Sequence, residues 1–163
     1  MASRLYQHLL ETYEPRRERS VLNGSGPAPI QVDDQNDGDN ITHFCTVFVT
    51  VGRKDRMLVE VEGHFPISPE LAAFAGQHGG NVDQKAGRLT VQVLPGQTGV
   101  LVELSERIRA TSGEGATVGN PEWSTIAGRT AGSIERLVSA VLAFLNPVAA
   151  VTADTGAMAR NHS

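Results

Sequence analysis

Cysteine and aromatic residues are scarce in this chain, and each scarcity excludes a class of structure. Cys45 is the only cysteine among 163 residues, so no disulfide can form within the chain and no zinc site can be built from its cysteines alone. Aromatic residues make up 5% of the sequence, whereas hydrophobic residues as a whole make up 40%. The core must therefore consist mainly of aliphatic side chains.

The chain also lacks an excess of positive charge and any long apolar run. Its formal net charge of -4 argues against a nucleic-acid binder with a broad basic surface. The one dense basic cluster, residues 16–19, is interrupted by Glu18, which favours a solvated segment. No apolar run approaches the roughly 18 residues of a membrane span, and residues 1–19 lack the apolar core of a signal peptide. We expect a cytoplasmic protein with no nucleic-acid or membrane partner.

What the sequence does contain is a set of alternating apolar segments. Residues 41–51, 57–65 and 89–93 alternate mostly at a period of two, which is the period of a β-strand, and the repeating apolar positions include Val47, Val49 and Val51, Val59 and Val61, and Leu89, Val91 and Val93. Residues 29–32 have the composition of a short edge strand. These segments predict an antiparallel sheet of four or five strands.

Three segments have helical spacing. Residues 4–13 carry Leu5 and Leu9 on one apolar stripe, and such a short helix must dock either on its own domain or on a second subunit. Ser68 followed by Pro69 predicts the start of a short helix, and Asn120 followed by Pro121 predicts a long helix that continues to residue 146. We expect the helices to pack mainly on one face of the sheet, which makes the chain an α+β protein.

Residues 99–110 fit two structures. Val100, Val102 and Leu104 alternate as in a strand, whereas Val100, Leu104 and Ile108 also line one side of a helix. The valine content and the preceding turn signal at Pro95 favour the second strand of a hairpin. Our prediction for this segment is a strand.

The sequence predicts one domain with flexible flanks. Residues 1–15 form the N-terminal helix, residues 16–40 a linker rich in Gly, Pro and Asp, residues 41–146 the α+β domain, and residues 147–163 a disordered tail. The acidic run at residues 33–39 departs from the calcium-loop pattern, so a solvated turn is the favoured interpretation.

No set of residues forms a recognisable catalytic or metal site. His43 and Cys45 share one face of a strand, but that face continues into valines, which indicates core. Neither His64 nor His78 adds a known ligand spacing, and Glu60 with Glu62 is best explained as a pair of solubilising charges. We predict no catalytic residue, no metal and no cofactor.

The order of elements resembles the type III secretion chaperone-like superfamily, including its YbjN-type relatives. The resemblance covers residues 4–145 and consists of a helix, an edge strand, two long strands, a short helix, a strand hairpin and a long helix. It implies a small α+β homodimer that binds an extended segment of another protein. The linker at residues 16–40 is longer than that pattern, and no functional residue can be transferred from it.

Our functional hypothesis is a non-catalytic adaptor or chaperone-like module that acts through protein contacts as a homodimer. The docking features are a partly apolar outer sheet face, the N-terminal helix, and a ridge of small residues on the long helix, with the predicted contact residues Phe44, Phe48, Leu5, Leu9, Gly128 and Gly132. One alternative is an enzyme or small-ligand binder whose pocket lies near His43, Cys45 and His64. Another is a structural subunit of a larger assembly.

Overall fold

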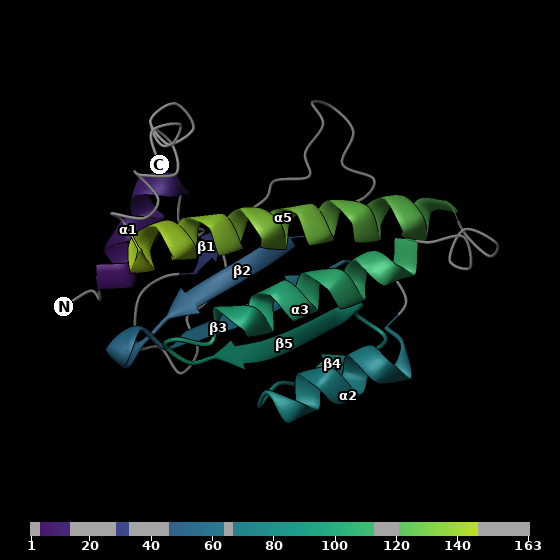
Figure 1. The fold of residues 1–163 in the computed structure, drawn as a ribbon. Coiled ribbons are helices and arrows are strands. Elements are labelled where there is room, and N and C mark those ends of the chain that lie inside the picture. The colour runs from purple at the N-terminus through teal and green to yellow at the C-terminus, as the bar shows by residue number, and fades with distance from the viewer. Residues whose placement is uncertain (1–3, 14–28, 33–45, 64–66, 113–120, 147–163) are drawn as a thin grey trace, which may run out of the picture.

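A five-stranded antiparallel sheet carries all of the described helices except α1 over one of its faces (Figure 1). The computed structural model describes residues 4–13, 29–32, 46–63, 67–112 and 121–146. Its elements are α1 (Arg4–Thr12), β1 (Ile30–Gln31), β2 (Thr46–Val51), the 3-10 turn η2 (Arg53–Asp55), β3 (Met57–Glu62), α2 (Pro69–Gln77), β4 (Val82–Asp83), β5 (Arg88–Val93), α3 (Thr98–Arg109), the 3-10 turn η3 (Ala110–Ser112) and α5 (Pro121–Leu145). The predicted α+β class is confirmed.

The strand order is β1-β2-β3-β5-β4, and every pair of neighbours is antiparallel. The three central strands have six residues each, whereas the edge strands β1 and β4 have two each. Very short edge strands leave few backbone groups on which a second sheet could grow. The sheet therefore ends in small, protected edges.

The helix-facing side of the sheet is a grid of nine aliphatic and methionine side chains. The register places three residues in each cross-strand row: Val47, Val61 and Leu89; Val49, Val59 and Val91; Val51, Met57 and Val93. All nine are buried. Burying one such side chain fully contributes roughly 1.5–3 kcal/mol, so this grid is the main apolar surface that the helices must cover.

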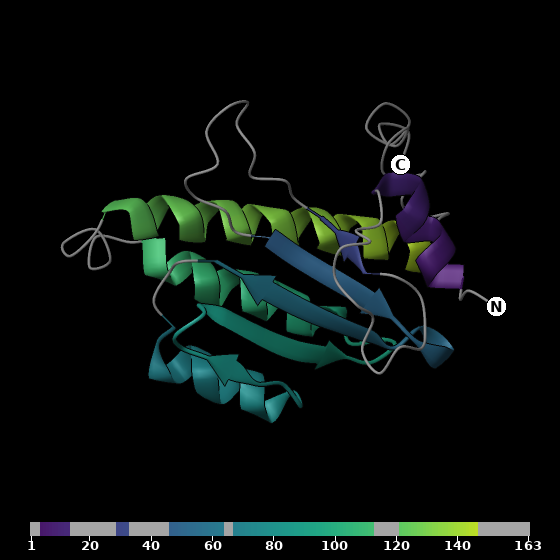
Figure 2. The same ribbon diagram turned by 180° about the vertical axis from the view of Figure 1, so that it is seen from behind.

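Helices α3 and α5 cover the grid and pack along each other (Figure 1). The buried side of α5 carries small side chains, since Ala127, Ala131, Thr130 and Ser133 are all fully buried. The two hydroxyl groups are satisfied within the helix, since Thr130 donates to the Ile126 carbonyl and Ser133 to the Arg129 carbonyl. Seen from behind, the opposite face of the sheet carries no described helix (Figure 2).

The short helix α2 begins as predicted and extends the helical layer towards the β4 edge. The Ser68 hydroxyl accepts a hydrogen bond from the Leu71 N–H at 3.0 Å, and Pro69 occupies the first turn. Phe74 is buried, and the Arg107 guanidinium of α3 lies 5.0 Å from the centre of its ring. The hydrogen-bonded cap at Ser68 and the buried ring of Phe74 thus hold α2 beside α3.

The prediction of a strand at residues 99–110 is wrong, because this segment is helix α3. Val100, Leu104 and Ile108 are buried at helical spacing, whereas Val102, which a strand would bury beside them, is 39% exposed. The physical reason lies in β5, whose two edges are both occupied. β3 pairs with one edge, and β4 with the preceding residues covers the other, so no edge remains for a hairpin strand.

The fifth strand of the sheet is instead β4, which the sequence pattern did not reveal. Along the same edge, the Gln92 N–H donates to the His78 carbonyl and the Thr90 N–H to the Asn81 carbonyl, each at 2.8 Å. The chain passes so close to β5 that a Cβ added to Gly80 would lie 1.6 Å from the Thr90 carbonyl oxygen. Glycine is therefore required at position 80.

We predict that Gly80→Ala lowers the free energy of unfolding by about 3 kcal/mol, since the methyl group must push two backbone segments apart. Gly76→Ala in α2 is the matched control, because an added Cβ there meets nothing within 4 Å. This control is expected to stabilise the chain by up to about 1 kcal/mol through helix propensity. Urea titration measures both, and equal stability of the Gly80→Ala and wild-type chains would contradict the close approach.

Candidate protein-binding surfaces

The outer face of the sheet is the broadest sheet surface over which no described helix packs (Figure 2). Its cross-strand rows mix polar, charged and apolar side chains: Thr46, Glu62 and Arg88; Phe48, Glu60 and Thr90; Thr50, Leu58 and Gln92. Seven of these nine side chains are partly exposed, whereas Thr46 and Phe48 are buried, Phe48 with 9% exposure. The face therefore presents a mainly polar surface with Leu58 as an apolar element.

A charged cluster joins β3 to β5 on this face. The Arg88 Nη1 lies 3.4 Å from a Glu60 carboxylate oxygen, and its Nε lies 3.8 Å from a Glu62 carboxylate oxygen. The three side chains are between 18% and 36% exposed, so these partly solvated pairs add little to stability. Among the described residues, the cluster thus joins two carboxylates to one guanidinium.

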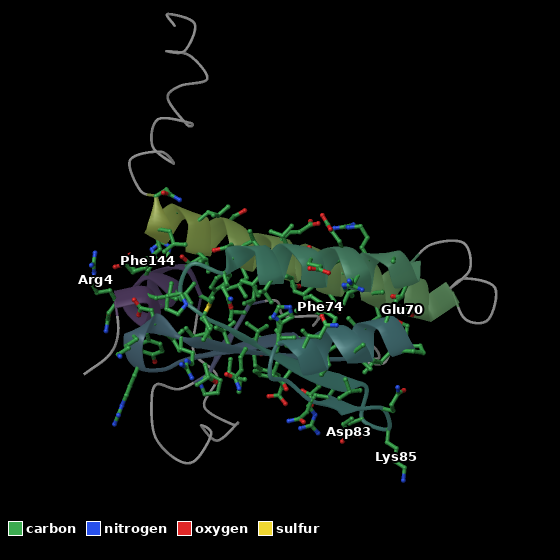
Figure 3. All side chains as sticks on the ribbon, turned by 60° about the horizontal axis from the view of Figure 1, so that its bottom comes forward. Arg4, Glu70, Phe74, Asp83, Lys85 and Phe144 are labelled. Carbon is green, nitrogen blue, oxygen red and sulfur yellow. The ribbon has the colours of Figure 1, made fainter. Side chains whose placement is uncertain are left out.

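An open depression of about 220 Å³ lies beside this cluster, between β3, β5 and the β4 edge. Glu60, Asp83, Arg88, Thr90 and Asn81 contribute its polar groups. Asp83 is exposed and lies with Lys85 at the outer corner of the sheet (Figure 3). A hollow of this size that is lined by the carboxylates of Glu60 and Asp83 suits a single cationic side chain of a partner. Only the strand register brings Asn81, Asp83 and Arg88 together, so no pattern in the sequence indicates this depression.

The residues predicted to contact a partner lie in different parts of the described chain. Leu5 and Leu9 are buried in the core, so α1 docks on its own domain and both side chains are occupied there. Gly128 and Gly132 lie on the partly exposed side of α5, where an added Cβ would meet nothing within 4 Å. Phe44, His43, Cys45 and His64 lie outside the described residues.

The remaining residues considered for chemistry have structural contacts. His78 ends α2, and its ring centre lies 4.6 Å from that of Phe74. Glu60 and Glu62 share one face as expected, and both face Arg88. Within the described part of the chain, no group of three or more His, Cys, Asp or Glu side chains is arranged to hold a metal ion.

Helix α1 lies against the C-terminal half of α5 and the β2–β3 turn (Figure 1). Its backbone N–H at Leu5 donates to the Asp55 carboxylate at 3.2 Å. Asp55 and the preceding Lys54 both have left-handed backbone angles, with φ values of 58° and 57°. Aspartate tolerates this conformation better than most residues. Asp55 therefore forms part of the β2–β3 turn and also accepts a hydrogen bond from the first turn of α1.

No protein family, no curated protein and no solved structure matches this chain. In the described ranges, no helix has the length and apolar character needed to cross a membrane. Fold and surface geometry thus define the class, an α+β protein with a one-sided helical layer. The proposed function is therefore based on the fold and the surface geometry.

Tyr13, which directly follows α1, gives the contact between α1 and α5 a measurable pH dependence. Burial raises the pKa of its phenol above the ordinary 10.0, and the nearby Arg136 guanidinium opposes the shift. The unfolded chain therefore loses this proton at a lower pH than the folded chain. The resulting stabilisation is present below about pH 10 and is lost as the pH rises through the raised pKa.

We predict that the unfolding temperature of the wild-type chain falls more steeply above about pH 10 than that of Tyr13→Phe, which has no phenol proton to lose. Differential scanning calorimetry of both chains in the same alkaline buffers measures the two slopes. All other titrating groups are shared, so their contributions cancel in the comparison. Parallel slopes would show that Tyr13 titrates alike in the folded and unfolded states.

Proposed function

We propose that the chain is a non-catalytic, chaperone-like adaptor that works as a cytoplasmic homodimer and binds an extended segment of another protein. The observation that carries the proposal is the outer sheet face, over which no described helix packs. Its cross-strand rows mix polar, charged and apolar side chains and follow one another every two residues, about 6.6 Å apart along a strand. A partner segment in extended form presents its side chains at the same spacing.

The charge on this face defines the segment that it would accept. The carboxylates of Glu60 and Asp83 line the depression beside β4, so a lysine or arginine of the partner is the complementary side chain there. Leu58 lies one row away and complements an apolar side chain. The favoured partner segment is therefore extended, with basic and apolar side chains two positions apart.

The order of elements also supports a chaperone-like class. Helix α1, three strands, α2 and two further strands precede the long α5, as in the type III secretion chaperone-like pattern. The chain differs from that pattern in having α3 where the resemblance implies a hairpin strand. The second candidate function, a pocket near His43, Cys45 and His64, concerns residues outside the described ranges, and no observation favours it.

We predict that a photo-reactive side chain placed at Leu58 or Thr90 forms a crosslink with the same partner protein in a lysate of the native cells. The same side chain at Val102 is the matched control, since Val102 is exposed on α3 in the helical layer. Contact with the outer sheet face requires adducts from the first two positions and none from the third. An identical adduct from Val102, or no adduct from either sheet position, would remove this face as the binding surface.

Charge reversal gives a quantitative form of the same test. Glu62→Lys is expected to weaken capture of the crosslinked partner about tenfold, equivalent to roughly 1.4 kcal/mol, because it repels a basic segment. Glu106→Lys on α3 makes the same charge change at an exposed site of the helical layer and should leave capture unchanged. Equal losses in both variants would indicate a general charge effect.

For the homodimer, we predict that alanine at Gly128 or Gly132 stabilises the folded chain but weakens self-association. Each Gly→Ala change raises the stability of the folded chain by about 1 kcal/mol, because the helix gains propensity and the added Cβ meets no described atom. The same methyl groups occupy the space that the backbone of a second copy would need, so self-association weakens. Sedimentation equilibrium and urea titration measure the two quantities, and a double variant that associates like the wild type would exclude this ridge as the interface.

A further inference from the structure

The cross-strand pair Asp83 and Arg88 brings opposite charges to one corner of the outer sheet face. The two residues are directly opposite each other in the register of β4 and β5, yet the structure gives no ion pair between them. The Asp83 carboxylate instead accepts a hydrogen bond from the Ala86 N–H at 3.2 Å, within the turn that joins the two strands. Arg88 contacts Glu60 and Glu62 on β3. A carboxylate and a guanidinium therefore share one side of the sheet without pairing with each other.

The Arg88 guanidinium makes fewer hydrogen bonds than it can. It carries N–H donors on Nε, Nη1 and Nη2, but the structure gives it one hydrogen bond to a described residue, from Nη1 to Glu60 at 3.4 Å. Its Nε is buried and has no hydrogen-bond acceptor among the described residues, since the Glu62 carboxylate lies 3.8 Å away. Buried donors in folded proteins almost always have an acceptor, so this guanidinium has unused capacity. Its side chain is 36% exposed, and a ligand in the depression can reach it.

The open depression beside β4 is lined by both of these charges. Asp83 and Arg88 border its volume of about 220 Å³, together with Asn81 and Thr90 of the neighbouring cross-strand row. The backbone fixes this row, because the Thr90 N–H donates to the Asn81 carbonyl at 2.8 Å and the Asn81 N–H donates to the Thr90 hydroxyl oxygen at 2.9 Å. Pockets for drug-sized ligands have roughly 300–1,000 Å³. This depression therefore suits a smaller molecule.

The charges of the lining decide between classes of small ligand. A simple cation pairs with Asp83 but gives Arg88 no acceptor, whereas a simple anion pairs with Arg88 but is repelled by Asp83. We propose that the depression is a binding site for a small zwitterion, namely a free α-amino acid. Its ammonium group pairs with the Asp83 carboxylate and its carboxylate pairs with the Arg88 guanidinium. The ligand thus bridges two charges that do not meet in the protein alone.

This site needs no partner protein, so it stands or fails separately from the proposed function. Where both hold, the amino acid competes with a basic side chain of the partner, because a carboxylate that is paired with an ammonium group is less available to a second cation. The shared group is Asp83. A free amino acid is then a regulator of binding at the outer sheet face.

The test is an NMR titration of the full chain with L-alanine as the probe, followed in the backbone amide signals. We expect saturable shifts at residues 81–83 and 88–90. The dissociation constant should be on the order of 1–10 mM, since an open depression leaves one side of the ligand in water. L-Alaninamide lacks the carboxylate and N-acetyl-L-alanine lacks the ammonium group, so each should bind at least about fivefold more weakly.

Two substitutions in the depression test the assigned contacts. Asp83→Asn removes the charge but keeps an oxygen that accepts from the Ala86 N–H, so it should weaken L-alanine binding at least about fivefold. Arg88→Gln should cause a similar loss, and Arg88→Lys, which retains the charge, should restore part of it. The matched control is Lys85→Gln, because Lys85 is exposed at the same corner of the sheet but does not line the depression (Figure 3).

The absence of a saturable shift with L-alanine up to about 50 mM would overturn the proposal. Equal affinity for L-alaninamide would identify a site for simple cations, and equal affinity for N-acetyl-L-alanine would identify one for anions, and either result excludes a zwitterion site. Unchanged binding by the folded Asp83→Asn chain would place the ligand elsewhere. None of these outcomes alters the crosslinking expected at Leu58, so failure of this site and failure of the proposed function can be told apart.

Discussion

The apolar grid on one side of the sheet has to be removed from water, and the arrangement of the other elements depends on how this is done. Rows such as Val49, Val59 and Val91 offer a flat, aliphatic surface without large side chains. Two helices can cover such a surface only if they also lie close to each other. The buried side of α5 carries small alanine, threonine and serine side chains, and the hydroxyl groups bond within their own helix. The result is a one-sided layer that leaves the opposite sheet face free of described helices.

Much of this arrangement could be predicted from local pattern. Alternation over residues 57–62 and 89–93 identified β3 and β5, and the Ser68–Pro69 pair identified the start of α2. The strand prediction for the segment that forms α3 failed for a non-local reason. Valine favours strands, but a strand needs a partner edge, and the short β4 with residues 78–81 had already taken the free edge of β5. A two-residue strand carries no periodic signal, so neither error could be avoided from the sequence.

The candidate surfaces were less predictable than the fold. Glu60 and Glu62 were recognised as a pair on one face, but the arginine between them comes from a strand 26 residues further along the chain, and only the register brings it there. Asp55 was likewise invisible, because a carboxylate in a hairpin turn has no sequence feature that links it to a helix 50 residues earlier. Sequence pattern therefore found the elements and the apolar stripes, whereas the electrostatic character of the surfaces followed from tertiary pairing.

The position of α1 has a consequence for the order in which the protein is made. Its contacts are with a turn 50 residues away and with a carbonyl group 132 residues away, so they are among the least local in the chain. Non-local contacts form late, since the intervening chain must first be ordered. During synthesis α1 emerges before α5, and about 130 residues separate the end of α1 from the end of α5, which takes on the order of 10 s. For that interval Leu5 and Leu9 lack their docking site, and the nascent chain carries an amphipathic segment whose apolar side chains are not yet covered.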